Sequence, residues 1–377
     1  MVKKFFATHS RLILELLVLV CVVLMAVRPL QGGIYRRFAT DTLHYERAEV
    51  TQVVSEELED SSLKTGQKLG KQLLRVQFSD GSEVELWNYL TDTHNILAAV
   101  GDSVIICVDV PENAEPYYTV YNYDRIPALC GLVLTFALLL VLIGHRKGVD
   151  AFLSLLFSLA FIVCVTLPAL YSGASPVLVG LLTVLLSTFV TLSLMHGLTA
   201  QCFLAIATTL LGTLAACLLF AVYSRWFYLT GFQTDEAEGL LLIAQNTGLN
   251  IRTLLAAGMM ISSLGAVMDV AVSILSSLRE VARVSPSLRG KDLFLSGIRV
   301  GQDLIGTMSN TLIFAFTGGA LSTMLVLYSY GVQVNQLLNS DYLAVEIVMG
   351  LCSTAAVILT VPAASAIGGA FYGKKAK

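Results

Sequence analysis

Apolar stretches long enough to cross a lipid bilayer recur along the chain, and most of them are separated by short polar connections. A helix needs about 20 apolar residues to cross the hydrocarbon core of a bilayer. We therefore predict an α-helical integral membrane protein with about eight transmembrane helices. The predicted spans are residues 12–30, 126–144, 151–171, 176–195, 200–223, 254–278, 304–330 and 343–367.

The connection between the first two spans, residues 31–125, is much longer than the others and has a different pattern. Apolar and polar residues alternate in several short runs, which is typical of half-buried β-strands. Ser79-Asp80-Gly81-Ser82 has the composition of a hairpin turn. We predict a small β-barrel or sandwich of about 65 residues, followed by a polar, tyrosine-rich stalk over residues 111–125. The predicted strands are residues 48–54, 73–78, 84–87 and 104–110.

Composition agrees with this division of the chain. The sequence is 55% hydrophobic and only 14% charged, which excludes a soluble globular protein of 377 residues. We expect an N-terminal membrane anchor (residues 1–30), an extracytoplasmic acidic β domain with its stalk (31–125), a seven-helix transmembrane bundle (126–371) and a basic cytoplasmic tail (372–377). We expect the lipid bilayer as the main partner of the chain, and no nucleic acid.

The distribution of basic residues predicts the orientation in the membrane. With the N-terminus inside, thirteen Lys and Arg residues fall on the cytoplasmic side, whereas the short outer connections hold only Arg225 and Arg252. Cytoplasmic connections carry an excess of basic residues. We expect a multi-pass protein of a bacterial plasma (inner) membrane with both termini in the cytoplasm. Segment 31–125 would then lie outside, with sixteen acidic against eight basic residues.

The most unusual residue within a predicted span is Asp269, which lies in the 25-residue apolar run 254–278. At 1.5 Å per helical residue it is about 13 Å from the inner end of that run. A carboxylate at this depth costs several kcal/mol unless it is solvated, paired or protonated. It belongs to a helical stripe of small and polar residues: Gly258, Ser262, Gly265, Asp269, Ser273 and Ser276.

A second polar face follows in the next span, where Asp303, Thr307 and Asn310 recur at helical spacing. Asn310 lies about 10 Å inside the start of that span, at a depth similar to that of Asp269. We expect the two faces to meet. Small and hydroxyl-bearing residues also serve helix packing, which explains most of them without a ligand. For Asp303, at the start of the predicted span, an N-terminal cap is the simpler interpretation.

The connections next to these helices suggest further elements. Segment 279–302 is basic, is broken at Pro286, and then shows the periodicity of an amphipathic helix lying on the inner membrane surface. Segment 224–252 is rich in aromatic residues, as is typical of an interfacial anchor. Thr317-Gly318-Gly319 predicts a flexible point in the seventh span. Glu346 lies close enough to the outer end of the last span to reach the interface.

Sequence signatures of catalysis or metal binding are missing. No Cys-x-x-Cys or His-Glu-x-x-His occurs, and Asp269 has no second carboxylate at the same depth, as an intramembrane aspartyl protease would need. We expect no enzyme activity, no metal and no cofactor.

Two long motifs resemble a known family. Gly265-Ala266-Val267-Met268-Asp269-Val270-Ala271-Val272-Ser273 and Gly301-Gln302-Asp303-Leu304-Ile305-Gly306-Thr307-Met308-Ser309-Asn310-Thr311-Leu312 are similar to the corresponding segments of YibE/F-like bacterial membrane proteins. The resemblance extends over most of the chain, including the outer β domain. It implies a multispanning membrane protein, and it assigns no function to any residue.

Two functions fit these features. In the first, the protein is a transporter or permease in which Asp269 binds a proton or cation, and Asn310, Thr307, Ser273 and Asp303 are the further candidates for a site that couples ion and substrate. In the second, it is a non-transporting scaffold or sensor whose extracytoplasmic domain binds a protein partner while its helices sit in the bilayer.

Overall fold

The computed structural model describes residues 2–27, 42–62, 66–111, 114–232 and 237–374, and describes side chains from residue 13 onward. Residues 31–41 of the predicted outer domain and residues 375–377 of the predicted basic tail therefore lie outside the described residues. The chain forms two compact units, Leu30–Leu139 and Met1–Pro29 with Leu140–Lys377, which are treated separately below. The predicted boundary at residue 125 falls between strand β5 (Tyr117–Tyr123) and helix α2 (Ile126–Phe161), within the first unit.

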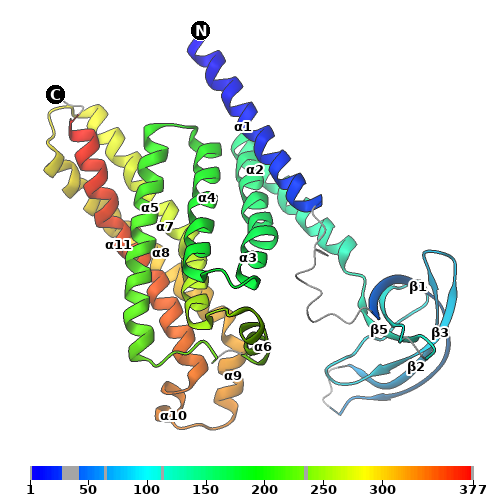
Figure 1. Ribbon diagram of the computed structural model, residues 1–377. Helices are drawn as coiled ribbons and strands as arrows, with labels where there is room; N and C mark the ends of the chain where they lie inside the picture. The colour runs from blue at the N-terminus through cyan, green and yellow to red at the C-terminus, as the bar shows by residue number, and fades with distance from the viewer. Residues whose placement is uncertain (1, 28–41, 63–65, 112–113, 233–236, 375–377) are drawn as a thin grey trace. The chain divides into compact units, whose positions relative to one another are not determined.

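Most of the chain is helical (Figure 1). After α1 (Val2–Val27) and α2 come η2, a π-helical turn (Ile162–Thr166), α3 (Leu167–Tyr171), α4 (Pro176–His196), α5 (Ala200–Trp226), α6 (Ala237–Thr247), α7 (Ile251–Val284), α8 (Gly290–Gly319), α9 (Leu321–Ser329), α10 (Val334–Leu338) and α11 (Asp341–Lys374).

The core of the helical unit lies among α4, α5, α7, α8 and α11. Helix α11 packs against α5, α7 and α8, and small residues allow close approach at these crossings. Gly297 and Gly301 of α8 lie against Ser365 and Val361 of α11, where no Cβ would fit. Packing of this kind suits helices in lipid, where close backbone approach replaces the hydrophobic effect.

Two helices are interrupted. In α2, His145 has non-helical φ and ψ of 48° and −129°, and Gly148 lies against the Leu140 carbonyl, so the chain turns sharply between two helical arms. Farther along, α8 ends at Gly319 and α9 begins at Leu321 with a bend of 56°. The second break directly follows Thr317-Gly318-Gly319, where the sequence predicts a flexible point; the break is seen, and the flexibility stays a prediction.

Within the described residues, five helices are long and apolar enough to cross a membrane, or six if α8 and α9 form one bent span. The described helices therefore agree with a helical protein that has several candidate membrane spans, but the predicted number of about eight is not confirmed. Two differences explain the lower number. The first predicted span, 12–30, is described with side chains only over Ile13–Val27, which is too short to be counted, and the predicted spans 126–144 and 151–171 form the single stretch Ile126–Tyr171, counted once despite the break at His145.

The break predicted at Pro286 is present, but the amphipathic helix after it is not a separate segment, because it continues into the seventh predicted span. Helix α7 continues to Val284, and α8 begins at Gly290 and runs without a break to Gly319. The periodic face that the sequence shows here packs on α11, since Leu293, Gly297 and Gly301 are buried. Periodicity identifies an apolar face, but it does not distinguish a lipid surface from a neighbouring helix.

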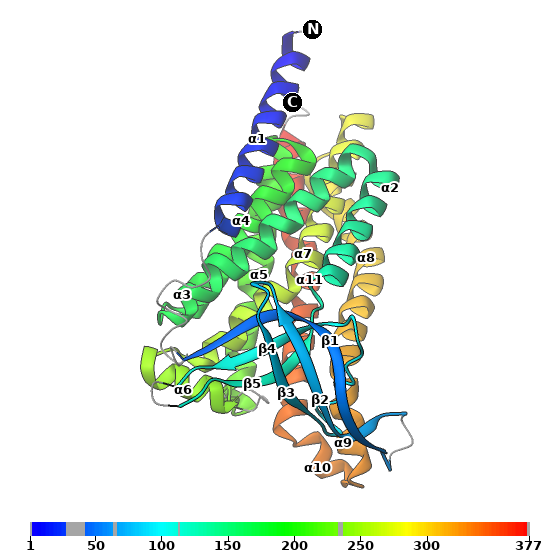
Figure 2. The ribbon, with the colours of Figure 1, turned by 90° about the vertical axis from the view of Figure 1, so that its right-hand side faces the viewer.

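The other unit contains a five-stranded antiparallel sheet with the order β3-β2-β1-β4-β5, which curls into a half-barrel (Figure 2). Its remaining strands are β1 (Leu43–Asp60), β2 (Lys68–Phe78), β3 (Glu83–Leu90) and β4 (Ser103–Asp109). Long β1 pairs with β2 through one half and with β4 through the other, with two bulges. Alternating residues such as Val50, Leu74, Val76, Val104 and Ile106 form the buried core.

All four predicted strands and the hairpin turn are present. In the turn, Phe78 N–H donates to the Ser82 carbonyl at 2.9 Å and Gly81 has a φ of 87°. The Ser82 hydroxyl and main-chain N–H donate to the Asp80 carboxylate, and they hold the pKa of Asp80 below its usual value. The predicted stalk is wrong in part, because Tyr117–Tyr123 forms the edge strand β5. This strand was missed from the sequence because its tyrosines are partly polar, so that apolar and polar positions do not alternate clearly along it.

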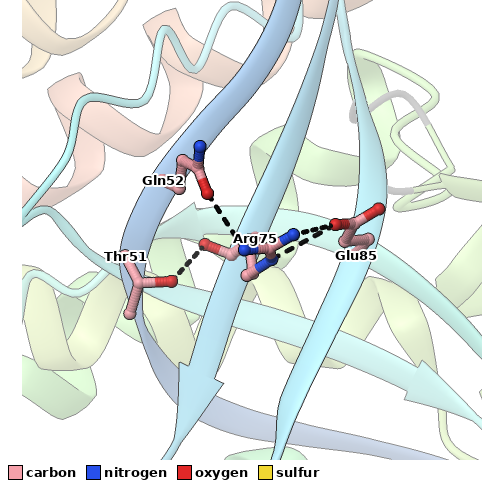
Figure 3. A network of polar contacts seen from close by, with 4 residues as sticks. All are labelled: Thr51, Gln52, Arg75 and Glu85. Carbon is pink, nitrogen blue, oxygen red and sulfur yellow. Dashed lines mark hydrogen bonds and ion pairs between the residues drawn. The ribbon is translucent and has the colours of Figure 1, made fainter.

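Polar side chains join strands β1, β2 and β3 on the solvent-facing side of the sheet (Figure 3). Arg75 of β2 donates to Glu85 of β3 at 2.6 Å and to Gln52 of β1 at 3.0 Å. The Thr51 hydroxyl donates to the Arg75 carbonyl at 3.1 Å. Exposed ion pairs of this kind add little stability, about 0–1 kcal/mol, so the buried apolar side holds the sheet together.

Replacement of Gly70 by alanine is expected to destabilise this sheet by about 2 kcal/mol or more, because the residue has a φ of 126° and an added Cβ would overlap the Glu57 carbonyl of β1. Amide hydrogen exchange of β1 and β2 in the full-length protein should accelerate by roughly 30-fold. Gly81→Ala is the matched control, because Gly81 also has a positive φ but its Cβ position is open. Equal acceleration in both variants would contradict the predicted overlap.

Candidate functional site

The polar stripe of α7 divides into three parts. Toward the N-terminus of α7, the Ser262 hydroxyl lies 3.1 Å from the Ser353 hydroxyl of α11. Toward the C-terminus, the Gln201 side chain of α5 donates to Ser276 at 2.6 Å and accepts from Arg279 at 2.7 Å. Both ends thus serve helix packing, as the structural interpretation of the stripe predicts.

The middle of the stripe, which contains Asp269, has no such partner. Asp269 and Gly265 are exposed, and Ser273 is half-buried. Within the described chain, no group forms a hydrogen bond or an ion pair with the Asp269 carboxylate. No described atom beyond its own stretch of helix lies within 4 Å of the point where a Cβ would stand on Gly265. The carboxylate therefore has open space one helical turn away.

The opposite side of α7 is buried in the core of the helical unit. Met260, Val267, Val270, Ile274 and Leu278 are fully buried there. This apolar side orients α7 and turns the Asp269 face away from the core. The orientation of the carboxylate is thus set by the packing of its own helix against α4, α5 and α11.

The polar face of α8 is exposed as well. Asp303, Thr307 and Asn310 are exposed, and the space beside Gly306 is open. The Thr307 hydroxyl donates only to the Leu304 carbonyl of its own helix, at 3.1 Å. In the described residues, no hydrogen bond or ion pair joins this face to Asp269 or Ser273. The expected meeting of the two faces is not seen, although α7 and α8 pack against each other elsewhere.

Asp303 is not the N-terminal cap that the sequence predicts. Helix α8 starts at Gly290, so Asp303 lies in its interior. The first turn is capped instead by Asp292, whose carboxylate accepts from the Arg289 N–H at 3.2 Å. Asp303 therefore has no role at a helix terminus. It is an exposed carboxylate on the same face of α8 as Thr307 and Asn310.

Three further acidic residues were not recognised as candidates from the sequence. Asp150 is fully buried in α2, five residues after the break at His145. Glu15 of α1 lies 3.6 Å from Arg146, which follows the same break. Glu346 lines a cavity between α8, α9 and α11. Asp150 was missed because it directly precedes the predicted span 151–171, and it was assigned to the polar connection before that span.

Comparison with known proteins gives one result. The model of the family described as "YibE/F-like protein" matches residues 132–374, which is well over half of the chain. No curated protein and no solved structure matches significantly. The matched region holds α7, α8 and α11, together with all five predicted site residues, and begins after the β-sheet. The resemblance predicted for the outer β domain thus lies outside it. The chain belongs to the YibE/F-like protein family.

Proposed function

We propose that this protein is a transporter or permease in which Asp269 binds and releases a proton or cation as the substrate crosses the membrane. The observation that carries this proposal is an unpaired carboxylate in the middle of a membrane-spanning helix, beside open space at Gly265. A structural carboxylate at such depth would be paired or tightly hydrogen-bonded. A carboxylate that ions must reach needs a free approach.

The exposed polar face of α8 supports the same function. The side-chain oxygens of Thr307 and Asn310 are suitable ligands for a cation that has shed part of its water, and Asp303 adds a negative charge to the same face of α8. Ser273 of α7 would supply a further hydroxyl on the Asp269 side. A face bearing these groups is not stable against lipid tails. In our proposal, it lines an aqueous path in at least one state of the transport cycle.

The bend between α8 and α9 supplies a mechanical element. Broken helices with irregular backbone at membrane depth are frequent in secondary transporters, where they move and line the substrate site. The 56° break follows directly on the helix that carries Asp303, Thr307 and Asn310. Movement of α8 relative to α11 would open or close the approach to these residues.

For the membrane topology, we propose eight spans. The stretch Ile126–Tyr171 would be about 69 Å long as one straight helix, more than twice the hydrocarbon thickness of about 30 Å. Its break at His145 divides it into two spans. The bent pair α8–α9 counts as one, and α1 as another with its basic N-terminal part inside.

In this proposal, the helices cross the plasma membrane of a bacterium. With eight spans, both termini are cytoplasmic and the β-sheet is extracytoplasmic. The C-terminal part of α11 and the start of α8 lie at one end of the helical unit, where Gly373 and Gly369 contact Gly290. This agrees with the expected cytoplasmic location of both the C-terminus and the basic connection between α7 and α8.

The test is a flux assay with purified protein in liposomes. Under an imposed membrane potential, and with inward gradients of H⁺ or Na⁺ applied in turn, we expect uptake of one ion to exceed that of protein-free liposomes by about tenfold. A fluorescent pH dye and ²²Na⁺ report the two ions. Absence of flux of either ion, with and without a substrate library, would contradict a coupled transporter.

A second function has one observation in its favour, the exposed aromatic side chains of the β domain. Tyr45 and Tyr121 stack edge to face with centroids 4.9 Å apart, and both are more than half exposed. Exposed aromatic residues are frequent in protein interfaces, so a scaffold or sensor that binds a protein partner outside the membrane is the alternative. If deletion of residues 42–123 leaves the cellular phenotype intact while Asp269→Asn abolishes it, this alternative is wrong.

A further inference from the structure

A cavity of about 390 Å³ lies in the helical unit at the joint between α8 and α9, against the first turns of α11. Its walls come from three helices that bring together residues distant in the sequence. Ala320 at the joint is buried and lines it, so the cavity exists because the helix bends there. The principal wall residues are Ile313, Phe316, Met324, Leu343, Ile347 and Leu351.

The walls are almost entirely apolar, with one ionisable residue, Glu346 of α11. This side chain is half-buried, and no group of the described chain forms a hydrogen bond or an ion pair with its carboxylate. Among the residues that the structure describes, no Lys, Arg or His lines the cavity, and Thr317 is the one other polar side chain in its wall. A single negative charge thus sits at the side of an apolar space without a countercharge from the wall.

We propose that this cavity binds a hydrophobic organic cation, a molecule with an apolar body and one positive charge. The body would fill the space beside Phe316 and Met324, and the charge would lie at the Glu346 carboxylate. Pockets that bind small molecules combine apolar walls with a few placed polar groups, and their volumes start at about 300 Å³. The aromatic face of Phe316 adds a second attraction for a cation.

Other ligands fit the cavity less well. One carboxylate and one hydroxyl are too few ligands for a metal ion, which takes about six oxygens in a calcium or magnesium site. A lipid phosphate would be repelled by Glu346. A neutral acyl chain would fill the apolar space but leave the carboxylate unpaired beside it, which is unfavourable. Binding here requires no ion at Asp269, so this site goes beyond the proposed transport function.

Binding can be measured with a matched pair of probes, tetraphenylphosphonium and tetraphenylborate, which share size and shape but have opposite charges. With the full-length protein in nanodiscs, we expect the cation to bind at least about tenfold more tightly than the anion. Protein-free nanodiscs correct for partition into lipid. Equal affinities for the two probes would overturn the proposal.

Two variants locate the binding. Glu346→Gln should remove the preference for the cation, whereas Asp341→Asn, in the exposed first turn of the same helix, should leave it unchanged. Gly350→Leu keeps the carboxylate but fills the cavity, because Gly350 lines it and the nearest atoms to the position of its Cβ belong to Phe316, at 3.5 Å. It should abolish binding of the cation. Unchanged binding in either Glu346→Gln or Gly350→Leu would refute the site, and the melting temperature of each variant shows that it is folded.

Discussion

Replacement of Asp269 by asparagine is expected to reduce coupled ion flux through the reconstituted protein by at least about tenfold. Asparagine has nearly the same size and can donate and accept hydrogen bonds, but it binds no proton and carries no charge. Loss of an interaction with a charged group costs about 1.5–3 kcal/mol, which corresponds to a factor of roughly 10 to 100. The measurement is the initial rate of H⁺ or Na⁺ uptake in liposomes that hold equal amounts of folded protein.

The same variant separates function from structure. Since no described group pairs with the Asp269 carboxylate, we expect the melting temperature of Asp269→Asn in detergent to equal or exceed that of the parent. Asp341→Asn, which removes a carboxylate at the start of α11, is the matched control and should keep full flux. Unchanged flux in Asp269→Asn would exclude this residue as the coupling site, and a large loss of stability would instead indicate a structural role.

Replacement of Gly301 by leucine is expected to have the largest effect on stability, about 3 kcal/mol or more. Gly301 of α8 is buried against Val361 of α11, and an added Cβ would overlap that side chain. Because both helices are rigid at this crossing, the side chain must push them apart, and overpacking of this kind costs about 1–3 kcal/mol or more. The melting temperature in detergent should fall by several degrees.

Position 306 supplies the control for this prediction. Gly306 lies on the same helix, but no described atom outside its own helical stretch is within 4 Å of its Cβ position. Gly306→Leu should therefore change the melting temperature little. Combining Gly301→Ala with Val361→Ala should recover part of the stability lost in Gly301→Ala alone, because the methyl groups removed from Val361 make room. Equal destabilisation at positions 301 and 306 would indicate loss of glycine flexibility instead of overlap between α8 and α11.

The sequence by itself determined the elements whose environment is uniform. Over the described residues, the predicted spans are helical, although 304–330 is divided between α8 and α9, because a helix in lipid must satisfy its own backbone hydrogen bonds whatever surrounds it. The turn at Ser79–Ser82 and the four strands beside it were also predictable, since alternation and turn composition are local signals. Strand β5 was missed because it is an edge strand whose tyrosines face both ways.

The unpaired acidic residue was predictable too, since its depth in an apolar run follows from counting residues along α7. Its surroundings were not. Periodicity placed Asp269 on a stripe with Ser262 and Ser276, but only the crossing of α11 and the position of Gln201 decided that the two ends of this stripe are paired and its middle is open.

Tertiary structure also decided which apolar face meets which neighbour. The periodic face around Gly301 packs on α11. Helix α8 runs without a break from Gly290, so Asp303 lies in its interior. The cavity at Glu346 exists only because α8 bends away from α9 at Ala320. A sequence records how far a residue is from the end of its own helix. What lies across from that residue depends on the angles at which helices cross, and these are set by side-chain packing between segments far apart in the chain.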